Sequence, residues 1–134
     1  MTRDELVETL AQVLRVGPPL RFALLFGSRA TGSARATSDI DIALVPVDSD
    51  LPLRAELELA VAVEAATGRR TDIVRLDRAP LLLRWEVART GIPISGEHAA
   101  IVRFRAMTAS EHADVGPSLA RAAETYRRRL AGGT

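Results

Sequence analysis

The sequence predicts an α+β protein in which a small mixed β-sheet is flanked by helices and the C-terminal end is helical. Short apolar runs bounded by glycine or proline alternate with longer segments in which apolar residues recur at helical spacing. Beyond about residue 97 only the helical spacing continues. The length of 134 residues suits one domain with a substantial core. A single domain over 1–134 is therefore expected, with about 97–131 as a C-terminal helical extension.

The first helix is predicted over residues 2–15. Thr2 and Glu5 have the spacing of a capping box, and one side of the segment is apolar. A glycine followed by two prolines at 17–19 ends this helix. The apolar runs predict four strands, the last of them a short edge strand: 20–26, 39–45, 70–76 and 92–94.

Two central helices separate the later strands. Ser49 and Asp50 are expected to cap the first of them, with Pro52 in its first turn. Asp77 and Pro80 are expected to open the second, which ends at a glycine near residue 91. The C-terminal segment predicts two helices, over about 97–108 and about 117–131.

The composition excludes several kinds of site. A net charge of +1 gives no general attraction to nucleic acid or membranes, so no direct nucleic-acid binding is expected. No apolar run reaches 18 residues and no signal-peptide pattern opens the chain, so a cytoplasmic location is expected. Cysteine and lysine are absent, which excludes disulfides, thiolate sites and the lysine of a Walker A loop. The two histidines, His98 and His112, are expected to have surface or packing roles.

The most informative motif is Gly27-Ser28 followed, after ten residues, by Asp39-Ile40-Asp41. Side chains two apart on a strand share a face, so the two carboxylates should project together, with their Cα atoms about 6.5 Å apart. Two such charges about 5 Å apart repel by about 3 kcal/mol at an effective dielectric of about 20. A fold that keeps them side by side is therefore expected to hold a cation. Mg²⁺ prefers carboxylates, usually one or two of them together with substrate phosphates.

Two further features extend this motif. A glycine at a strand end lets the backbone approach a ligand, the N–H groups of a following helix suit phosphate, and the Ser28 hydroxyl adds a hydrogen bond. Asp72 opens the strand at 70–76 and completes a three-carboxylate cluster if that strand pairs beside 39–45. Such a cluster suits two-metal phosphoryl transfer. Taken singly, Gly27-Ser28 is typical of an ordinary turn, and each aspartate is typical of a solvated strand end.

Other motifs give weaker indications. Residues 27–33 have the glycine spacing of a Walker A loop, but Ser33 stands where the lysine belongs. Arg29 and Arg35 either contact phosphates or are solvated loop residues. Arg127-Arg128-Arg129 is typical of a solvated helix end, with contact to a partner or to RNA as the alternative. Three further aspartates are expected to be turn and cap residues: Asp48, Asp50 and Asp77.

Together, Gly27-Ser28, Asp39-Ile40-Asp41 and the later Asp72 resemble the signature of the nucleotidyltransferase superfamily of polymerase-β type. Their spacing is similar to that of the minimal nucleotidyltransferases, the MNT antitoxins of HEPN–MNT toxin–antitoxin pairs. The resemblance covers about residues 5–108 by the order of elements, and no motif position departs from the pattern. It implies the polymerase-β-like nucleotidyltransferase fold.

The resemblance also implies a function, which is Mg²⁺-dependent transfer of a nucleoside monophosphate, AMP from ATP, onto a hydroxyl. By position, Asp39 and Asp41 would bind metal, with two ions expected, and Asp72 would bind metal and aid deprotonation. Gly27 and Ser28 would hold the triphosphate. The acceptor in that family can be a tyrosine of the partner HEPN toxin, which the modification silences. The resemblance therefore predicts a catalytic antitoxin.

Two alternatives remain open. One is a non-catalytic antitoxin, a binding module that occludes its partner through the C-terminal helix and the helix around Trp85. The other is a transferase that acts on a small-molecule hydroxyl. The first alternative differs from catalysis in dose, because an occluding antitoxin is needed in equimolar amount and an enzyme is not.

Overall fold

A four-stranded mixed sheet forms the centre of the protein, for which a computed structural model describes residues 1–32 and 38–132. The strands are β1 (Leu20–Phe26), β2 (Ile40–Pro46), β3 (Thr71–Arg75) and β4 (Ile92–Gly96). Their order in the sheet is β3-β2-β1-β4. β1 pairs antiparallel with β2 and β4, whereas β2 and β3 are parallel. The predicted small mixed sheet is therefore confirmed.

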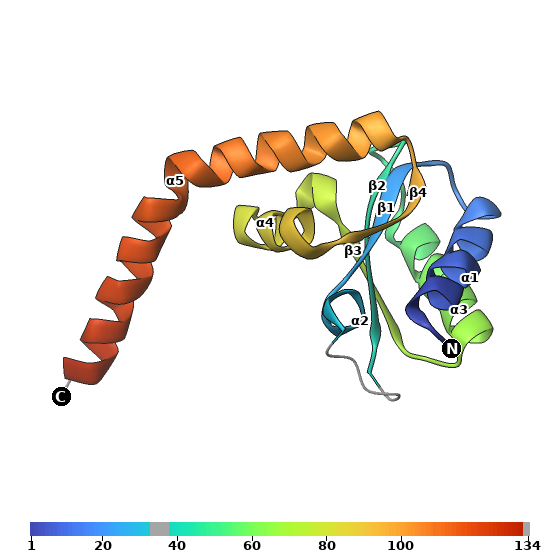
Figure 1. Ribbon diagram of the computed structural model, residues 1–134, viewed down its shortest axis with the longest axis horizontal. Coiled ribbons are helices and arrows are strands. Elements are labelled where there is room, and N and C mark those ends of the chain that lie inside the picture. The colour runs from blue at the N-terminus through green and yellow to red at the C-terminus, as the bar shows by residue number, and fades with distance from the viewer. Residues whose placement is uncertain (33–37, 133–134) are drawn as a thin grey trace.

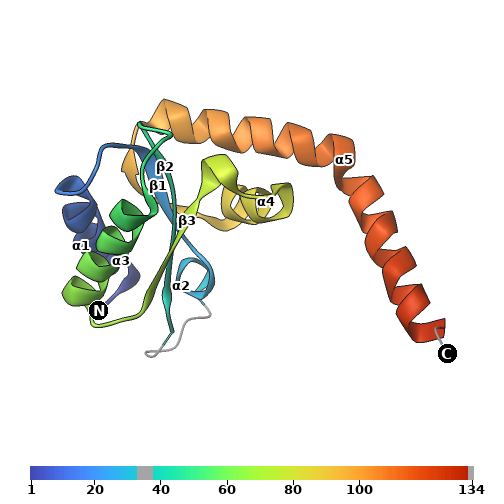
Figure 2. The ribbon, with the colours of Figure 1, turned by 180° about the vertical axis from the view of Figure 1, so that it is seen from behind.

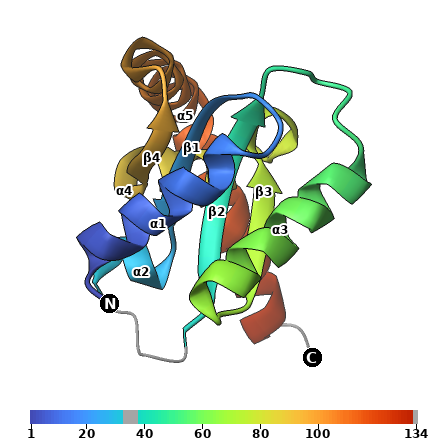
Figure 3. The same cartoon turned by 90° about the vertical axis from the view of Figure 1, so that its right-hand side faces the viewer.

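Helices cover both faces of this sheet (Figures 1 and 2). α1 (Arg3–Arg15) and α3 (Leu53–Thr67) lie on one face and cross in front of the strands in Figure 3. α4 (Leu81–Thr90) and the first half of α5 (His98–Gly132) lie on the other. The described residues also form two short helices, α2 (Ser28–Thr31) and the 3-10 helix η1 (Leu76–Arg78). The described residues contain no helix with both the length and the apolar content that a membrane span requires.

Each face of the sheet has its own apolar core. In β1, Ala23 and Leu25 pack under α1 and α3, whereas Phe22, Leu24 and Phe26 pack under α4 and α5. Successive strand residues point to opposite faces, so a strand buried on both sides reads as a continuous apolar run. This explains why residues 22–26 carry no polar side chain.

The N-terminal helix forms as its sequence predicts. The Thr2 hydroxyl accepts a hydrogen bond from the Glu5 N–H, and the Glu5 carboxylate accepts one from the Thr2 N–H. This capping box satisfies two N–H groups that have no partner within the helix. Three leucines one helical turn apart are buried against the sheet: Leu6, Leu10 and Leu14.

The predicted cap of α3 is wrong. Pro52, not Ser49 or Asp50, is the N-cap residue, and the helix begins after it. The Ser49 carbonyl instead accepts a hydrogen bond from the Arg75 guanidinium at 3.0 Å, and the Asp50 N–H donates to the Asp48 carboxylate at 2.9 Å. Asp48 is therefore a turn residue, as expected. The segment curls over a buried guanidinium and does not start the helix.

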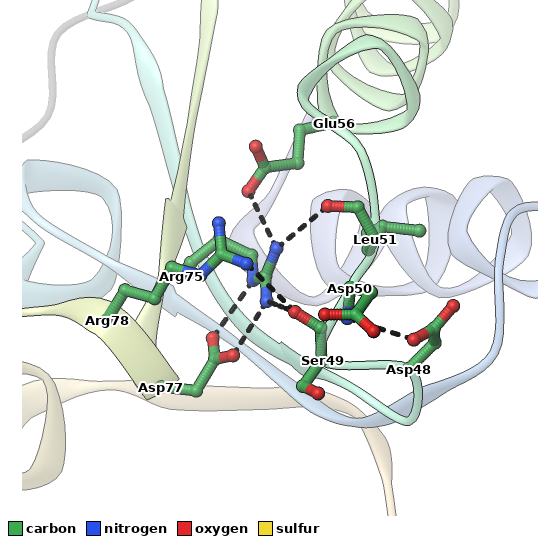
Figure 4. A network of polar contacts seen from close by, with 8 residues as sticks. All are labelled: Asp48, Ser49, Asp50, Leu51, Glu56, Arg75, Asp77 and Arg78. Atoms are coloured by element: carbon green, nitrogen blue, oxygen red, sulfur yellow. Dashed lines mark hydrogen bonds and ion pairs between the residues drawn. The ribbon is translucent and has the colours of Figure 1, made fainter.

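That guanidinium belongs to Arg75, which is 7% exposed at the end of β3 (Figure 4). It donates to the Leu51 carbonyl, forms two hydrogen bonds with the Asp77 carboxylate and lies 3.8 Å from Glu56. Its five N–H donors need acceptors once they leave water. Asp77 is consequently an ion-pair partner within η1, and the prediction that it opens α4 is wrong, because α4 begins after Pro80.

The C-terminal segment is one helix and not two. α5 runs without a break from His98 to Gly132, with Pro117 inside it. Figures 1 and 2 show a bend midway along this helix. A proline within a helix lacks the N–H donor and pushes away the carbonyl four residues earlier, which bends the helix. The expected gap at 109–116 is absent because Thr108, Glu111 and His112 all contact the body of the protein or α4.

Candidate functional site

The glycine of the Gly-Ser turn lies at the end of β1. Gly27 has φ 75° and ψ −155°, a backbone conformation that residues with side chains rarely adopt. A Cβ atom at this position would also overlap the Asp41 carboxylate. The close approach of the turn to Asp41 therefore requires glycine at position 27 for two independent reasons.

Ser28 begins α2 directly after this glycine. The N–H groups of Ala30 and Thr31 donate to the Gly27 carbonyl, which closes the short helix. Ser28 is half-buried, and within the described residues no hydrogen bond engages its hydroxyl. The hydroxyl is thus available to a ligand beside Asp41.

Asp41 and Asp72 are direct neighbours in the sheet. They are register partners on the parallel strands β2 and β3, and Asp41 is also paired with Phe26 on β1. Alternation places Asp41 on the same face as Ala43, and Asp72 on the same face as Val74. Ala43 and Val74 belong to the core under α4 and α5, so both carboxylates project toward that face. β3 does pair beside β2, which was the condition on which the sequence left Asp72, and this pairing brings Asp72 beside Asp41.

Asp39 lies one residue before β2 and is exposed. Burial raises the pKa of Asp41 above its ordinary value, and the charges of Asp72, Asp39 and Glu86 raise it further. Three further carboxylates thus act on Asp41, which lies at the end of the sheet where β1 ends and β2 and β3 begin. Figure 3 shows α2 and the start of β2 at this end.

Glu86 is a residue that no pattern in the sequence points to. It lies on α4 beside the buried Val87, and its charge reaches Asp41 although the two are 45 positions apart in the chain. A glutamate on an amphipathic helix is typical of a solvated face, so no local pattern singles it out. Only the packing of α4 against the sheet places it near the other carboxylates.

The donor set suits a hard divalent cation, because carboxylate oxygens are the ligands of Mg²⁺ and a cation would offset the mutual repulsion. In the described part of the chain, however, no three aspartate, glutamate, histidine or cysteine side chains stand close enough together to hold a metal ion. Mg²⁺ commonly takes only one or two protein carboxylates and completes its shell with substrate phosphates and water. The residues therefore fit a metal that binds together with a nucleotide.

Arg29 connects the two halves of the motif. Its guanidinium donates to the Ser38 carbonyl from Nε at 3.2 Å and from Nη2 at 2.7 Å. Ser38 directly precedes Asp39, so these bonds tie α2 to the approach to β2. Arg29 is thus a half-buried residue that joins α2 to the segment before β2, and it is not a solvated loop residue. The second arginine considered in the sequence, Arg35, lies outside the described residues.

Other charged groups lie away from this site. The Arg75 cluster of Figure 4 is at the opposite end of β3 from Asp72, and there the Arg75 guanidinium lowers the pKa of Asp77. His112 stacks on Trp85 with ring centroids 4.2 Å apart, so the expectation of a packing role is confirmed for this histidine. These residues therefore stabilise the fold and are not part of the candidate site.

Residues 8–99 match the family model of the polymerase beta nucleotidyltransferases. The chain belongs to this family and is classed with the nucleotidyltransferases. The family resemblance and the fold predicted from the sequence are confirmed. No curated protein sequence matches the chain at a significant level.

Solved structures give the same fold over longer spans. A chain of a toxin–antitoxin crystal structure with AMP-PNP is 27% identical, has a TM-score of 0.80, and the match covers 90% of this chain and 98% of that one. A chain from a complex of MNT antitoxin with the tri-AMPylated HEPN toxin of Shewanella oneidensis is 24% identical, with a TM-score of 0.76 and coverages of 94% and 99%. A protein provisionally assigned as a minimal nucleotidyltransferase is 31% identical, with a TM-score of 0.59 and coverages of 69% and 96%.

Proposed function

We propose that this protein is a cytoplasmic antitoxin that transfers AMP from ATP, with Mg²⁺, onto a tyrosine hydroxyl of a partner HEPN toxin. The observation that carries the proposal is the register pairing of Asp41 with Asp72 on one face of the sheet, with Asp41 also next to Gly27. Membership of the nucleotidyltransferase family supports the reaction class. The neighbours crystallised as toxin–antitoxin complexes, one with AMP-PNP and one with an AMPylated toxin, support the nucleotide and the acceptor.

Each residue has a proposed task. Gly27 and Ser28 bind the triphosphate, the former through its close backbone and the latter through its hydroxyl. Asp39 and Asp41, with Asp72, would hold Mg²⁺, two ions in this proposal. When bound, the metal would neutralise the charge of the phosphates and orient them for in-line displacement.

Asp72 is the proposed proton acceptor, because it is exposed beside Asp41 and a bulky acceptor can reach it. The acceptor hydroxyl gives its proton to the Asp72 carboxylate, and its oxygen forms a bond to the α-phosphorus of ATP. The bond from that phosphorus to the bridging oxygen breaks, and pyrophosphate leaves. The acceptor then carries AMP through a phosphodiester.

Incubation with radiolabelled ATP, Mg²⁺ and the product of the adjacent gene tests this proposal. Label is expected on the acceptor, and substitution of its modified tyrosine by phenylalanine should abolish labelling. A folded, metal-loaded protein that leaves the acceptor unlabelled would contradict the proposal.

A second function, neutralisation by occlusion, is favoured by the exposed apolar residues of the second half of α5. Titration of toxin activity separates the two. Substoichiometric neutralisation that depends on ATP supports catalysis, whereas an equimolar requirement without ATP supports occlusion.

A further inference from the structure

The second half of α5 extends away from the rest of the protein. We call residues 117–132 the arm. Figures 1 and 2 show it beyond the bend, projecting away from the sheet and the other helices. Within the described residues, the hydrogen bonds and ion pairs of its side chains are all internal, such as those that join Arg121 to Ser118 and Arg127 to Glu124. The arm therefore makes no polar contact with the body of the protein.

The base of the arm is nevertheless firmly held. Trp85 stacks on His112, and the Arg84 guanidinium donates to both Glu111 oxygens at 2.8 and 3.1 Å. Just before this point Thr108 is 2% exposed. The direction of the arm is thus set by α4 and by the bend at Pro117.

One side of the arm and the turn before it is apolar. Val115, Leu119, Tyr126 and Leu130 are spaced by four, seven and four residues, which places them along one side of a helix. All four are exposed, Tyr126 and Leu130 by 63% and 64%. A lone helix of about 16 residues is marginal in water, and an uncovered apolar stripe gains most from a partner surface.

The arm is also basic. Four arginines stand against a single glutamate over residues 117–132, although the whole chain has a net charge of only +1. Arg129 lies next to the apolar stripe by helical position. A complementary partner would therefore offer apolar side chains flanked by acidic ones.

The arm lies on the side of the sheet where the carboxylates project. Asp41 and Asp72 face the layer of α4 and α5, and the arm continues from α5 on that side (Figures 1 and 2). A protein bound to the arm would therefore lie on the same side of the sheet as the candidate site.

Similar chains of known structure indicate which kind of protein would bind the arm. The family domain ends at residue 99, and the 31% identical neighbour covers 69% of this chain, about the length of that domain. The match to the chain from the toxin complex covers 94% of this chain, which leaves too few residues outside it to omit the whole arm. The arm is thus a feature shared with a chain that was crystallised with a toxin.

We propose that the arm is the docking surface for the protein acceptor, which it binds through the apolar stripe and Arg129. This inference rests on the proposed function, because the acceptor is the HEPN toxin named there. In this proposal the arm recognises the acceptor, whereas Gly27 and Ser28 recognise the nucleotide.

The test uses the full chain with Leu119→Gln and Tyr126→Gln together, since glutamine is polar and keeps the helix. The matched control carries Ala120→Gln and Ala131→Gln, two exposed alanines on the other side of the arm. Affinity for the product of the adjacent gene is measured without nucleotide, so the result does not depend on transfer. The stripe variant should bind at least tenfold more weakly, and the control within twofold of the unmodified chain.

Transfer kinetics give a second measurement. The KM for the acceptor should rise by the same factor in the stripe variant, with the KM for ATP unchanged. Equal affinities of the stripe variant and its control would overturn the docking proposal. A stripe variant that is monomeric where the unmodified chain is dimeric, with acceptor affinity unchanged, would assign the stripe to a second copy and also overturn it.

The outcomes distinguish the two proposals. Stripe-dependent binding of an acceptor that never receives label would refute the proposed transfer and leave docking supported. Arg129→Glu should weaken binding several-fold at low salt and less at high salt. Unchanged affinity of this variant would refute the acidic character assigned to the partner.

Discussion

Replacement of one site carboxylate by its amide should make the protein more stable and inactive at the same time. Asp41 and Asp72 are register partners on neighbouring strands, which lie about 4.8 Å apart. Two unit charges at about 5 Å repel by about 0.8 kcal/mol in water and by about 3 kcal/mol at an effective dielectric of about 20. Since Asp41 is half-buried and Asp72 exposed, solvent screening favours the lower part of this range. Asp41→Asn is therefore expected to raise the unfolding free energy by about 1 kcal/mol.

Thermal unfolding in EDTA at neutral pH measures this gain. For a chain of this size, about 1 kcal/mol corresponds to a rise in Tm of about 3–5 °C. Transfer should meanwhile fall by at least about 100-fold, because one of the carboxylates proposed to hold the Mg²⁺ that neutralises the phosphate charge is lost. Addition of Mg²⁺ with a non-hydrolysable ATP analogue should raise the Tm of the unmodified chain more than that of Asp41→Asn.

The pH dependence has a definite sign. The folded-state pKa of Asp41 is raised, so the folded protein binds this proton more tightly than the unfolded chain does. The loss of stability caused by ionised Asp41 is absent below the pKa that this group has in the unfolded chain. It grows as the pH rises from that value to the raised folded-state pKa, and it is complete above the raised pKa. The stability advantage of Asp41→Asn should accordingly shrink as pH falls through that window.

Asp50→Asn is the control, because Asp50 is exposed in the turn before α3 and its side chain has no part in the site. It should leave both Tm and transfer unchanged. A loss of more than 1 kcal/mol in Asp41→Asn would refute the reasoning, since it would mean that the carboxylate is held by favourable contacts and not by constraint against like charges.

Three further substitutions test other parts of the structure. Gly27→Ala forces a side chain into a glycine conformation and against Asp41, so it should cost about 1–3 kcal/mol in a urea titration and impair transfer; wild-type stability would contradict this. Arg75→Met leaves several buried acceptors unpaired and should cost about 3–5 kcal/mol with little effect on nucleotide affinity, and a loss under 1 kcal/mol would show the cluster to be dispensable. Arg29→Gln removes the bonds to Ser38 and should weaken Mn²⁺ binding, followed by electron paramagnetic resonance, by about 10–100-fold, with partial recovery in guanidinium; a change in ATP affinity alone would instead indicate a phosphate contact.

Local patterns predicted those parts of the fold that neighbouring residues determine. The capping box of Thr2 and Glu5 and the strand that ends at Gly27 depend on residues within a few positions of one another. Prediction failed where a distant partner competes for the same groups. Ser49 does not cap α3 because its carbonyl accepts a hydrogen bond from the Arg75 guanidinium. α5 continues through Pro117 because its middle packs against α4, where His112 stacks on Trp85.

The sequence by itself determined the chemistry of the site: a glycine-serine turn, three aspartates, and no lysine or cysteine to compete with them. The alternation of side chains along a strand also predicted that Asp39 and Asp41 share a face. Only the tertiary structure decided that Asp72 stands in register with it, that Glu86 joins them, and that the second half of α5 extends on the same side. The reason is physical, because strand register and helix packing are fixed by contacts between residues far apart in the chain, and no local spacing records them.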